Sequence, residues 1–451
     1  MNVTTNPKPK KSLWDIRTDG TSYKRVLAAA IAFMGLGHIL YLKEWLKGIL
    51  FATAEGVMLA FLPKIIRRVI GMFTLGSPKS DLPIMQRDNS IFMLIDGIII
   101  TVIIMLFITL YILSVKSALS SYKDYCRDKS FKSTGKSLRE ITDKAFPIAG
   151  LAPALIMIMF FVVVPLVFSS AVAFTNYSAP SHIPPNNTVD WVGLDNFKAL
   201  LGGEALWTGA MGRVALWTFV WAALATLTCY FGGLIMAVIL KESKLRIAPV
   251  FRGIFILPYA VPSVLTMLIW KNLLNGSFGT VNRTLAALGL INTAIPWLSN
   301  EWMAKFTCVL INLWAGFPYF MLLSMGSMTA ISEDVQEAAV IDGASNLQKF
   351  RKLTLPMVLF QTMPLIIMSF TYNINNFGAI FFLTGGGPNV ADSTTTTAGG
   401  TDILVTWIYD LTINLLRYNY AAVIGVMIFL ALAPFAIWNF RRTKAFKEGE
   451  L

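Results

Sequence analysis

The sequence predicts an all-α protein, a polytopic bundle of about eight transmembrane helices, and three observations carry this prediction. The chain of 451 residues is 55% hydrophobic and only 14% charged, whereas soluble domains average about 45–50% apolar and about 25% charged residues. Its apolar residues gather in runs, several of which reach the roughly 18–20 residues that a helix needs to cross a bilayer. Its basic residues gather between those runs. A soluble fold of this composition would expose large apolar patches, so we interpret the chain as a membrane protein.

The apolar runs set the expected order of the helices. The eight expected spans are 46–63, 91–114, 149–174, 211–240, 249–272, 304–330, 357–383 and 418–440. A ninth stretch, 26–42, is rich in Ala and Gly and short for a span, which favours an interfacial or re-entrant helix. The N-terminus is polar and basic and lacks the short apolar core of a signal peptide.

The formal net charge of +13 has a topological explanation. Lys and Arg accumulate in alternate loops, and basic loops stay on the cytoplasmic side. The basic loops are 115–148, 241–246 and 441–451, whereas 175–210 holds only Lys198 and 384–416 holds no Lys or Arg. We therefore expect a cytoplasmic C-terminus and no nucleic-acid partner.

One loop conflicts with this topology. Residues 64–90 are basic, yet with eight spans they fall on the outer side. Two alternatives stay open: the loop violates the rule, or the first segments do not cross the membrane simply.

The sequence holds little material for catalysis. Three cysteines lie far apart and there are only two histidines, so zinc sites and a Ser–His–Asp triad are not expected. The phosphate-binding pattern GxxxxGK[ST] is missing. We expect no catalytic residue, no metal ligand and no cofactor in this chain, which would then not be an enzyme.

The cytoplasmic segment 331–356, ISEDVQEAAVIDGASNLQKFRKLTLP, predicts two short helices. Ser332 can cap the first helix, Gly343 permits a sharp turn after it, and Pro356 is expected to stop or redirect the chain. The first helix has no strong apolar face of its own. It is either an amphipathic connector on the membrane or an element that docks on another protein.

Polar side chains inside two spans mark a second feature, because such groups usually face a bundle interior or a cavity. They recur at helical spacing, which places each set on one helix face. The sets are Asn312, Gly316 and Tyr319 in the sixth span and Ser369, Asn373 and Asn376 in the seventh. They either hydrogen-bond helices together or line a pocket for an uncharged, hydroxyl-rich ligand such as a sugar.

The cytoplasmic segment also carries a resemblance. Its runs Glu337-Ala338-Ala339, Asp342-Gly343-Ala344 and Leu353-Thr354-Leu355-Pro356 resemble the EAA loop of binding-protein-dependent ABC permeases, with Leu353 in place of the usual Ile. The resemblance implies that this loop couples the permease to an ATPase, with Glu337 as the polar contact. The coupling residues that it implies are Glu337, Ala338, Ala339, Asp342, Gly343, Leu355 and Pro356.

From about residue 147 onward the chain is similar to the larger permease subunit of maltose/maltodextrin importers. The matching stretches are FTNYS (174–178), GLDNF (193–197), LPYAVPS (257–263), GSFG (276–279), SFTYNINNF (369–377) and TGGGPN (384–389). This implies a type I ABC importer permease core with a sugar pocket. The implied pocket residues are Asn312, Gly316, Tyr319, Ser369, Tyr372, Asn373 and Asn376.

The resemblance also implies a set of partners. They are a second permease subunit in a heterodimer, two ATPase subunits that hold ATP and Mg²⁺, an extracellular sugar-binding protein, the oligosaccharide and the lipid of a bacterial cell membrane. Some family members hold a folded domain in the outer loop after the third span, whereas here that loop has only about 35 residues. The two outer loops, 176–197 and 384–400, are either mere connections or a surface for this extracellular partner.

We expect four regions along the chain: accessory helices in 1–115, a basic linker in 116–148, the permease core in 149–440 and a tail in 441–451. A permease for another oligosaccharide or a polyol is one alternative, and a membrane scaffold without transport is another. An ion-coupled carrier would need titratable groups inside its spans, and the clearest one, Asp96, lies outside the core.

Overall fold

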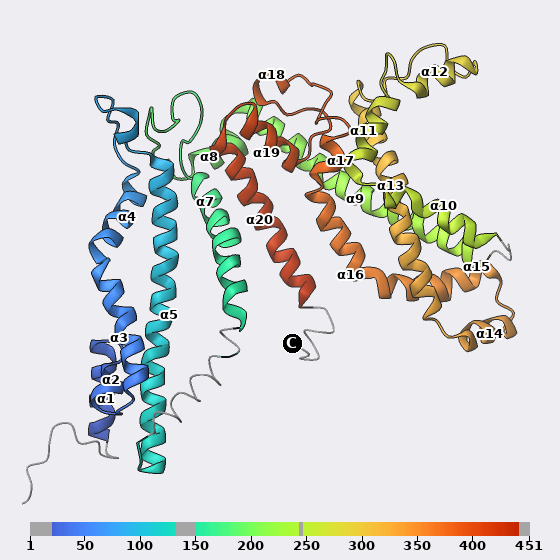
Figure 1. Cartoon of the computed structure of the whole chain (residues 1–451). Helices are drawn as coiled ribbons and strands as arrows, with labels where there is room; N and C mark the ends of the chain where they lie inside the picture. The colour runs from blue at the N-terminus through green and yellow to red at the C-terminus, as the bar shows by residue number, and fades with distance from the viewer. Residues whose placement is uncertain (1–19, 132–145, 147–149, 243–246, 442–451) are drawn as a thin grey trace, which may run out of the picture. The chain divides into compact units, whose positions relative to one another are not determined.

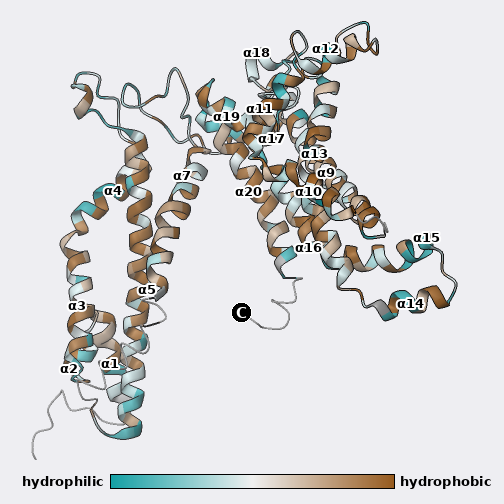
Figure 2. Ribbon diagram, turned by 45° about the vertical axis from the view of Figure 1, so that its right-hand side comes forward, coloured by the Kyte–Doolittle hydropathy of each residue, from teal (hydrophilic) through white to brown (hydrophobic). Residues whose placement is uncertain are grey.

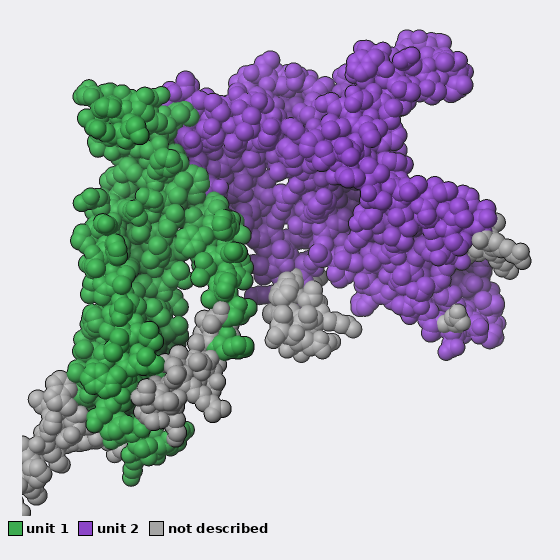
Figure 3. All heavy atoms as spheres, in the orientation of Figure 1, with its two compact units in different colours: residues 1–168, 182–190 green, residues 169–181, 191–451 purple. Residues whose placement is uncertain are grey.

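The computed structural model describes residues 20–131, 146, 150–242 and 247–441. It is predominantly helical (Figure 1) and divides into two compact units, coloured in Figure 3. Unit 1 comprises residues 1–168 and 182–190, and unit 2 comprises residues 169–181 and 191–451. The predicted N-terminal tail up to residue 19, most of the expected basic linker and the tail from residue 442 lie outside the described residues.

The fold class is confirmed by the helices that are long and apolar enough to cross a membrane, shown by hydropathy in Figure 2. Among the described residues there are six single helices of this kind, and two bent helix pairs bring the number of spans to as many as eight. The single spans are Ile84–Asp128, Gly150–Val172, Ala205–Lys241, Glu301–Thr329, Asn346–Ile374 and Tyr418–Asn439.

Unit 1 is built around one long helix. Its elements are α1 (Gly20–Ala32), α2 (Leu36–Leu40), α3 (Trp45–Ala60), α4 (Leu62–Thr74), the short η1 (Ile84–Gln86) and α5 (Ser90–Asp128). Helices α1 and α4 pack on α5, while α3 packs on α2 and α4. The expected ninth stretch, 26–42, is the end of α1 followed by α2, and the chain breaks at Gly35 with a φ of 83°. A Cβ at Gly35 would meet the carbonyl oxygen of Gly48, so only glycine fits there.

The prediction that residues 64–90 form an outer loop is wrong for residues 64–74, which are helical. Helix α4 occupies Leu62–Thr74 and forms a bent pair with α3 at an angle of 56°. Pro63 lies in the first turn of α4, where its missing N–H costs nothing. Of the five basic residues of 64–90, three therefore belong to a helix beside α5. The structure thus favours the alternative in which the first segments do not cross simply.

Unit 2 contains all the helices from α8 onward. They are α8 (Asp195–Lys198), α9 (Ala205–Glu242), α10 (Ala248–Ala260), α11 (Ser263–Leu273), α12 (Thr280–Ala287), α13 (Glu301–Thr329), α14 (Glu333–Ile341), α15 (Asn346–Lys349), α16 (Leu355–Ile374), α17 (Phe377–Phe381), α18 (Ser393–Thr396), α19 (Leu404–Ile413) and α20 (Tyr418–Phe440). Two π turns of this unit are η3 (Ala199–Gly203) and η4 (Phe350–Thr354). A third π turn, η2 (Met159–Val163), belongs to unit 1, and the helix α7 (Val164–Val172) that follows it is divided between the two units at residue 168.

Helices α9 and α13 form the most closely packed pair of unit 2, and small residues make this possible. A Cβ on Gly233 of α9 would lie 2.5 Å from the backbone nitrogen of Met321 on α13. Helix α16 packs against both α9 and α13. The three helices form the frame on which the candidate site is built.

Two expected spans are broken. The span 249–272 is two helices, α10 and α11, that meet at 90°. Pro262 explains the break, because the residue before a proline is driven out of the helical region, and Val261 has the extended values φ −84° and ψ 133°. The span 357–383 ends early, at Ile374, and α17 begins after Asn376. The side chain of Asn376 accepts a hydrogen bond from the N–H of Ala379, 3.3 Å away, and so caps α17.

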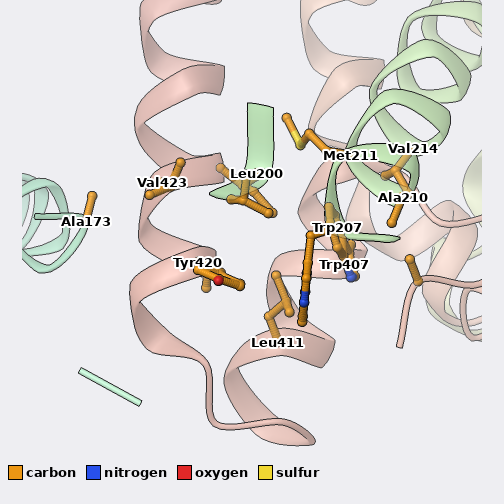
Figure 4. Packing of buried hydrophobic residues seen from close by; sticks show 13 residues of the cluster. Ala173, Leu200, Trp207, Ala210, Met211, Val214, Trp407, Leu411, Tyr420 and Val423 are labelled. Carbon is orange, nitrogen blue, oxygen red and sulfur yellow. The ribbon is translucent and has the colours of Figure 1, made fainter. Parts of the chain in front are cut away.

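A large apolar cluster anchors the segment 384–403 to the helices around it (Figure 4). Trp207 and Trp407 lie in it with ring centroids 6.3 Å apart, and Tyr420 presents its ring edge to Trp207. The indole N–H of Trp407 donates a 2.8 Å hydrogen bond to the carbonyl of Thr396. The segment contributes Ala398 to the cluster, and Trp217 of α9 also donates a hydrogen bond to its Thr401 carbonyl at 3.1 Å.

Candidate functional site

A cavity of about 430 Å³ opens between α13 and α16, with α9 and α10 contributing to its walls. All seven residues predicted for a sugar pocket line it: Asn312, Gly316, Tyr319, Ser369, Tyr372, Asn373 and Asn376. Two polar sets that lie about fifty residues apart in the sequence therefore meet at one place. Whether each side chain touches a sugar stays a prediction.

The α13 wall of the cavity is set by contact with α9. A Cβ on Gly316 would lie 2.7 Å from the Sγ of Cys229. The amide nitrogen of Asn312 donates to the same Sγ at 3.4 Å, and the thiol of Cys229 donates to the Asn312 carbonyl at 3.3 Å. Gly316 is thus required for close helix packing, independently of any ligand.

The α16 wall is a hydrogen-bonded network around Asn373, which is buried. The amide nitrogen of Asn373 donates to the hydroxyl of Thr226 at 3.1 Å, and its amide oxygen accepts from Asn376 at 3.3 Å. The indole of Trp221 donates to the Asn373 carbonyl at 3.1 Å. Asn373 therefore does both things expected of the polar residues in the spans: it lines a cavity, and it joins α16 to α9 by hydrogen bonds.

Aromatic rings complete the cavity. Tyr372 and Tyr319 are exposed, by 67% and 37%. Tyr259, which the sequence analysis missed as a site residue, lies with its ring centroid 6.1 Å from that of Tyr319. The signal was present in Pro258 and Pro262, because irregular backbone at membrane depth usually lines a cavity.

A second cavity of about 440 Å³ follows the break between α10 and α11. It shares Tyr259, Asn312, Gly316, Tyr372 and Asn376 with the first. In the described part of the chain, the lining of both cavities contains no acidic or basic side chain and no histidine. Amides and hydroxyls that both donate and accept, beside aromatic faces, suit an uncharged hydroxylated ligand rather than an ion.

The segment 331–356 folds into the two predicted helices, α14 and α15. Gly343 makes the turn between them with a φ of 75°. Ser332 occupies the N-cap position of α14 without a side-chain hydrogen bond, whereas Ser345 and Gln348 form a reciprocal capping box on α15. Of the two outcomes expected at Pro356, a stop is wrong, because the helix continues from α15 through η4 into α16; a change of direction there stays a prediction. The π turn lies one turn before Pro356 and accommodates its missing N–H.

Apolar side chains stand exposed on this otherwise polar pair of helices. Ile341 is 85% exposed, and Glu337 beside it is also exposed. The other exposed apolar residues of the pair are Val335, Val340 and Leu347. Exposed apolar groups with a charged rim on α14, which lies between two candidate spans, are typical of a surface that another protein covers.

The segment 384–403 is held by an ion pair that is partly buried and by a buried carboxylate, that of Asp402. The guanidinium of Arg213 donates to a carboxylate oxygen of Asp392 and to the Gly399 carbonyl, each at 2.7 Å. The carboxylate of Asp402 accepts from the Gly399 N–H and from the Thr406 hydroxyl, each at 2.7 Å. Burial raises the pKa of Asp402 to about 6 from an ordinary value of 3.8, against the opposing hydrogen bonds.

This pKa predicts that the segment is more stable in mild acid. The folded chain keeps the Asp402 proton up to about pH 6, whereas the unfolded chain loses it near pH 3.8. Stability is therefore greatest below pH 4 and falls as the pH rises through the interval from 4 to 6. The full effect corresponds to about 3 kcal/mol. Hydrogen exchange of the amides of residues 398–406 should slow on going from pH 7 to pH 5, after correction for intrinsic rates, and Asp402→Asn should remove this difference. An equal pH dependence in the variant would contradict the assignment.

The comparisons with known proteins agree with this architecture. The family described as "Binding-protein-dependent transport system inner membrane component" matches residues 230–441. The galactooligosaccharide transport permease GanP of Bacillus subtilis is 38% identical over 415 residues, which cover 92% of this chain and 96% of GanP. The maltodextrin transport permease MdxF of the same organism is 33% identical over 443 residues, covering 96% of this chain and 98% of MdxF. MalF of Vibrio parahaemolyticus is 36% identical over 271 residues, about half of its length.

Among solved structures, a bacterial ABC transporter involved in the import of the acidic polysaccharide alginate is similar in fold. The TM-score is 0.53 at 21% identity, and the match covers 68% of this chain and 99% of that one. The similarity of the larger maltose-type permeases to this chain is confirmed by the full-length relatives. The chain is therefore a multi-pass membrane protein that belongs to the binding-protein-dependent permeases, as the permease of a sugar ABC importer.

Proposed function

We propose that this permease imports maltose and maltodextrins by alternating access, with the sugar bound in the cavity between α13 and α16. The observation that carries the proposal is the composition of that cavity, in which amides, hydroxyls and tyrosine rings converge without a charged side chain. Relatives named as maltodextrin permeases support the choice of substrate.

The candidate residues take different parts in this proposal. Tyr372, Tyr319 and Tyr259 offer exposed ring faces for stacking on sugar rings. Asn312, Ser369 and Asn376 supply hydrogen bonds to hydroxyl groups. Asn373 is a positioning residue, because protein groups already satisfy its amide, and Gly316 keeps α13 against α9.

Energy enters through partner chains. We propose that two ATPase subunits, which hold ATP and Mg²⁺, dock on α14 and α15 and transmit their closure as a rigid-body movement. Contact residues are Glu337, Ala338 and Ala339, with the exposed Ile341 beside them. Asp342 and Gly343 form the turn, and Leu355 with Pro356 joins the loop to the span.

The remaining assembly follows the same proposal. A second permease subunit completes the translocation path, and a sugar-binding protein docks outside. The C-terminus lies in the cytoplasm, and this chain itself hydrolyses nothing. Residues 149–440 form the permease core, 1–115 an accessory region, 116–148 a basic linker and 441–451 a tail.

Galactooligosaccharides are a second candidate substrate, because GanP is 38% identical over nearly its whole length. They are also neutral chains of sugar rings, so the chemistry of the cavity suits both classes. The arrangement of hydroxyls, rather than charge, must then decide between them.

The test is ATP hydrolysis by the complete importer in liposomes, with its own binding protein. Maltose, maltotriose, a galactotriose and glycerol phosphate are added separately at equal concentration. Stimulation by maltose and maltotriose alone is the expected result. Stimulation by galactotriose alone would move the substrate to the second candidate. Stimulation by glycerol phosphate alone would overturn the assignment of the uncharged cavity to the sugar site.

A further inference from the structure

Unit 1 contains a groove that the transport mechanism does not use. Its volume is about 560 Å³, and it lies where α3 bends into α4 and leaves a space beside α5. Its apolar lining includes Ala54, Val57, Phe61, Ile103, Leu106 and Leu110. Val57, Phe61 and Leu106 are each about half exposed, so the groove is open from the side.

One end of the groove is basic. Lys64 and Arg68 line it, and they lie on one face of α4 at a spacing of four residues. Arg68 is 3.6 Å from the carboxylate of Asp96 on α5. Among the described residues, Lys64 and Arg67 form no ion pair, and the ammonium of Lys64 instead lies over the ring of Phe61.

The excess of positive charge at this end of the groove matters because of the depth at which it lies along α5. Asp96 lies six residues into α5, or about 9 Å along its axis from Ser90. Helix α4 packs beside that part of α5, whose residues 91–114 are almost entirely apolar. Cations at this depth are costly unless an anion or water accompanies them. In the groove one carboxylate, Asp96, serves two cations, Lys64 and Arg68, so the missing partner is an anion.

The groove beyond the basic end defines what kind of anion fits. From Asp96 to Leu110 the axis of α5 rises about 21 Å, and along this length the lining is hydrocarbon. A soluble anion would leave this part empty, whereas a lipid would fill it and bring its own phosphate. We propose that the groove binds one anionic phospholipid, with its phosphate at Lys64 and Arg68 and an acyl chain running toward Leu110.

The same elements explain why a zwitterionic lipid is a weaker occupant. A phosphatidylcholine head would bring a quaternary ammonium next to a site that already has excess positive charge. A phosphatidylglycerol head brings only the anion, which basic residues near the membrane surface attract. Selection by headgroup charge is therefore the property to measure.

The experiment uses the full-length permease in nanodiscs that contain phosphatidylcholine with or without one-fifth phosphatidylglycerol. The permease is released from the nanodiscs in the mass spectrometer, and native mass spectrometry then counts the phosphatidylglycerol molecules that stay bound to it. We expect one retained lipid in the unmodified chain and at least a fivefold loss of retention in Lys64→Gln/Arg68→Gln. Arg67→Gln is the matched control, because Arg67 lies on the same helix but not in the groove, and it should retain the lipid.

Two further variants change the groove without removing its cations. Asp96→Asn removes the competing carboxylate and should increase retention, a result that misfolding could not produce. Ala54→Phe fills the apolar part and should lower retention while all charges remain.

Three results would overturn the proposal. Equal losses of retained lipid in Arg67→Gln and in the double variant would show that the basic residues of α4 attract anionic lipid without a specific site. Displacement by millimolar glycerol phosphate would show a site for soluble anions. A photo-crosslinker at Leu106 that captures the second permease subunit in place of lipid would show a protein interface.

Discussion

Glu337→Lys is expected to abolish sugar-stimulated ATP hydrolysis by the assembled importer while its permease still folds. Glu337 is exposed on α14 and makes no contact that the fold needs. Reversal of its charge places a repulsive group in the centre of the proposed ATPase contact, where a single residue can be worth about 2–4 kcal/mol. Such a loss lowers the affinity of the two subunits by about thirtyfold or more. The measurement is ATPase activity of the reconstituted complex with and without substrate, together with co-purification of the ATPase.

Asp334→Lys is the matched control, since Asp334 is an exposed acid of the same helix outside the EAA run. Ile341→Asp tests the apolar part of the same contact and should act in the same direction as Glu337→Lys. If Glu337→Lys and Asp334→Lys lowered the activity equally, the loop would act through its net charge and not through a specific contact. Normal stimulation in Glu337→Lys would remove the coupling role from this residue.

Tyr372→Ala and Asn373→Leu should both impair uptake, but by separable routes. Tyr372 is 67% exposed toward the cavity, so its removal should leave stability within about 0.5 kcal/mol. Loss of its stacking face should raise the KM for sugar roughly tenfold, as expected for about 1–1.5 kcal/mol. Asn373 joins α16 to α9, and Asn373→Leu leaves the Thr226 hydroxyl and the Asn376 amide without their partner. This should cost about 1–3 kcal/mol of stability and lower kcat as well.

Sugar uptake into proteoliposomes and thermal unfolding of the purified permease separate the two cases. Tyr372→Phe is the control for the first variant, because it keeps the ring and should keep the KM. A KM unchanged in Tyr372→Ala would take the ring out of the sugar site. An Asn373→Leu protein of normal stability with raised KM alone would mean that Asn373 contacts the sugar directly.

The positions of the spans could be predicted from hydropathy, because a helix in lipid must be apolar over its whole length. The breaks could not be predicted in the same way. Val261 and Pro262 lie within an apolar run whose mean composition does not change at the bend. Proline identifies a place where a helix can end, but neighbouring helices decide that α11 turns by 90°.

The candidate cavity was predictable in part. The helical spacing of Asn312, Gly316 and Tyr319 places them on one face, and the structure confirms that this face meets the polar residues of α16. The part played by Thr226 in holding Asn373 was not predictable, because a pairing between α9 and α16 depends on tertiary packing. In unit 1, the basic residues of α4 were misassigned to a loop, since charge alone does not distinguish a loop from a helix with a polar face.

The contact between Gly233 and Met321 has a consequence for how the walls of the cavity can move. Two helices whose backbones touch have no layer of side chains between them that could repack during sliding. Helices α9 and α13 should therefore travel together as one rigid plate through the transport cycle. The opposite wall, which consists of α16 and the bent α10–α11 pair, must then swing. Helix α16 is continuous with α15 through η4, whereas α13 reaches α14 only through the short link 330–332. The distance between labels on α9 and α13 should not change between the outward-open and inward-open states. The distance between labels on α13 and α16 should change.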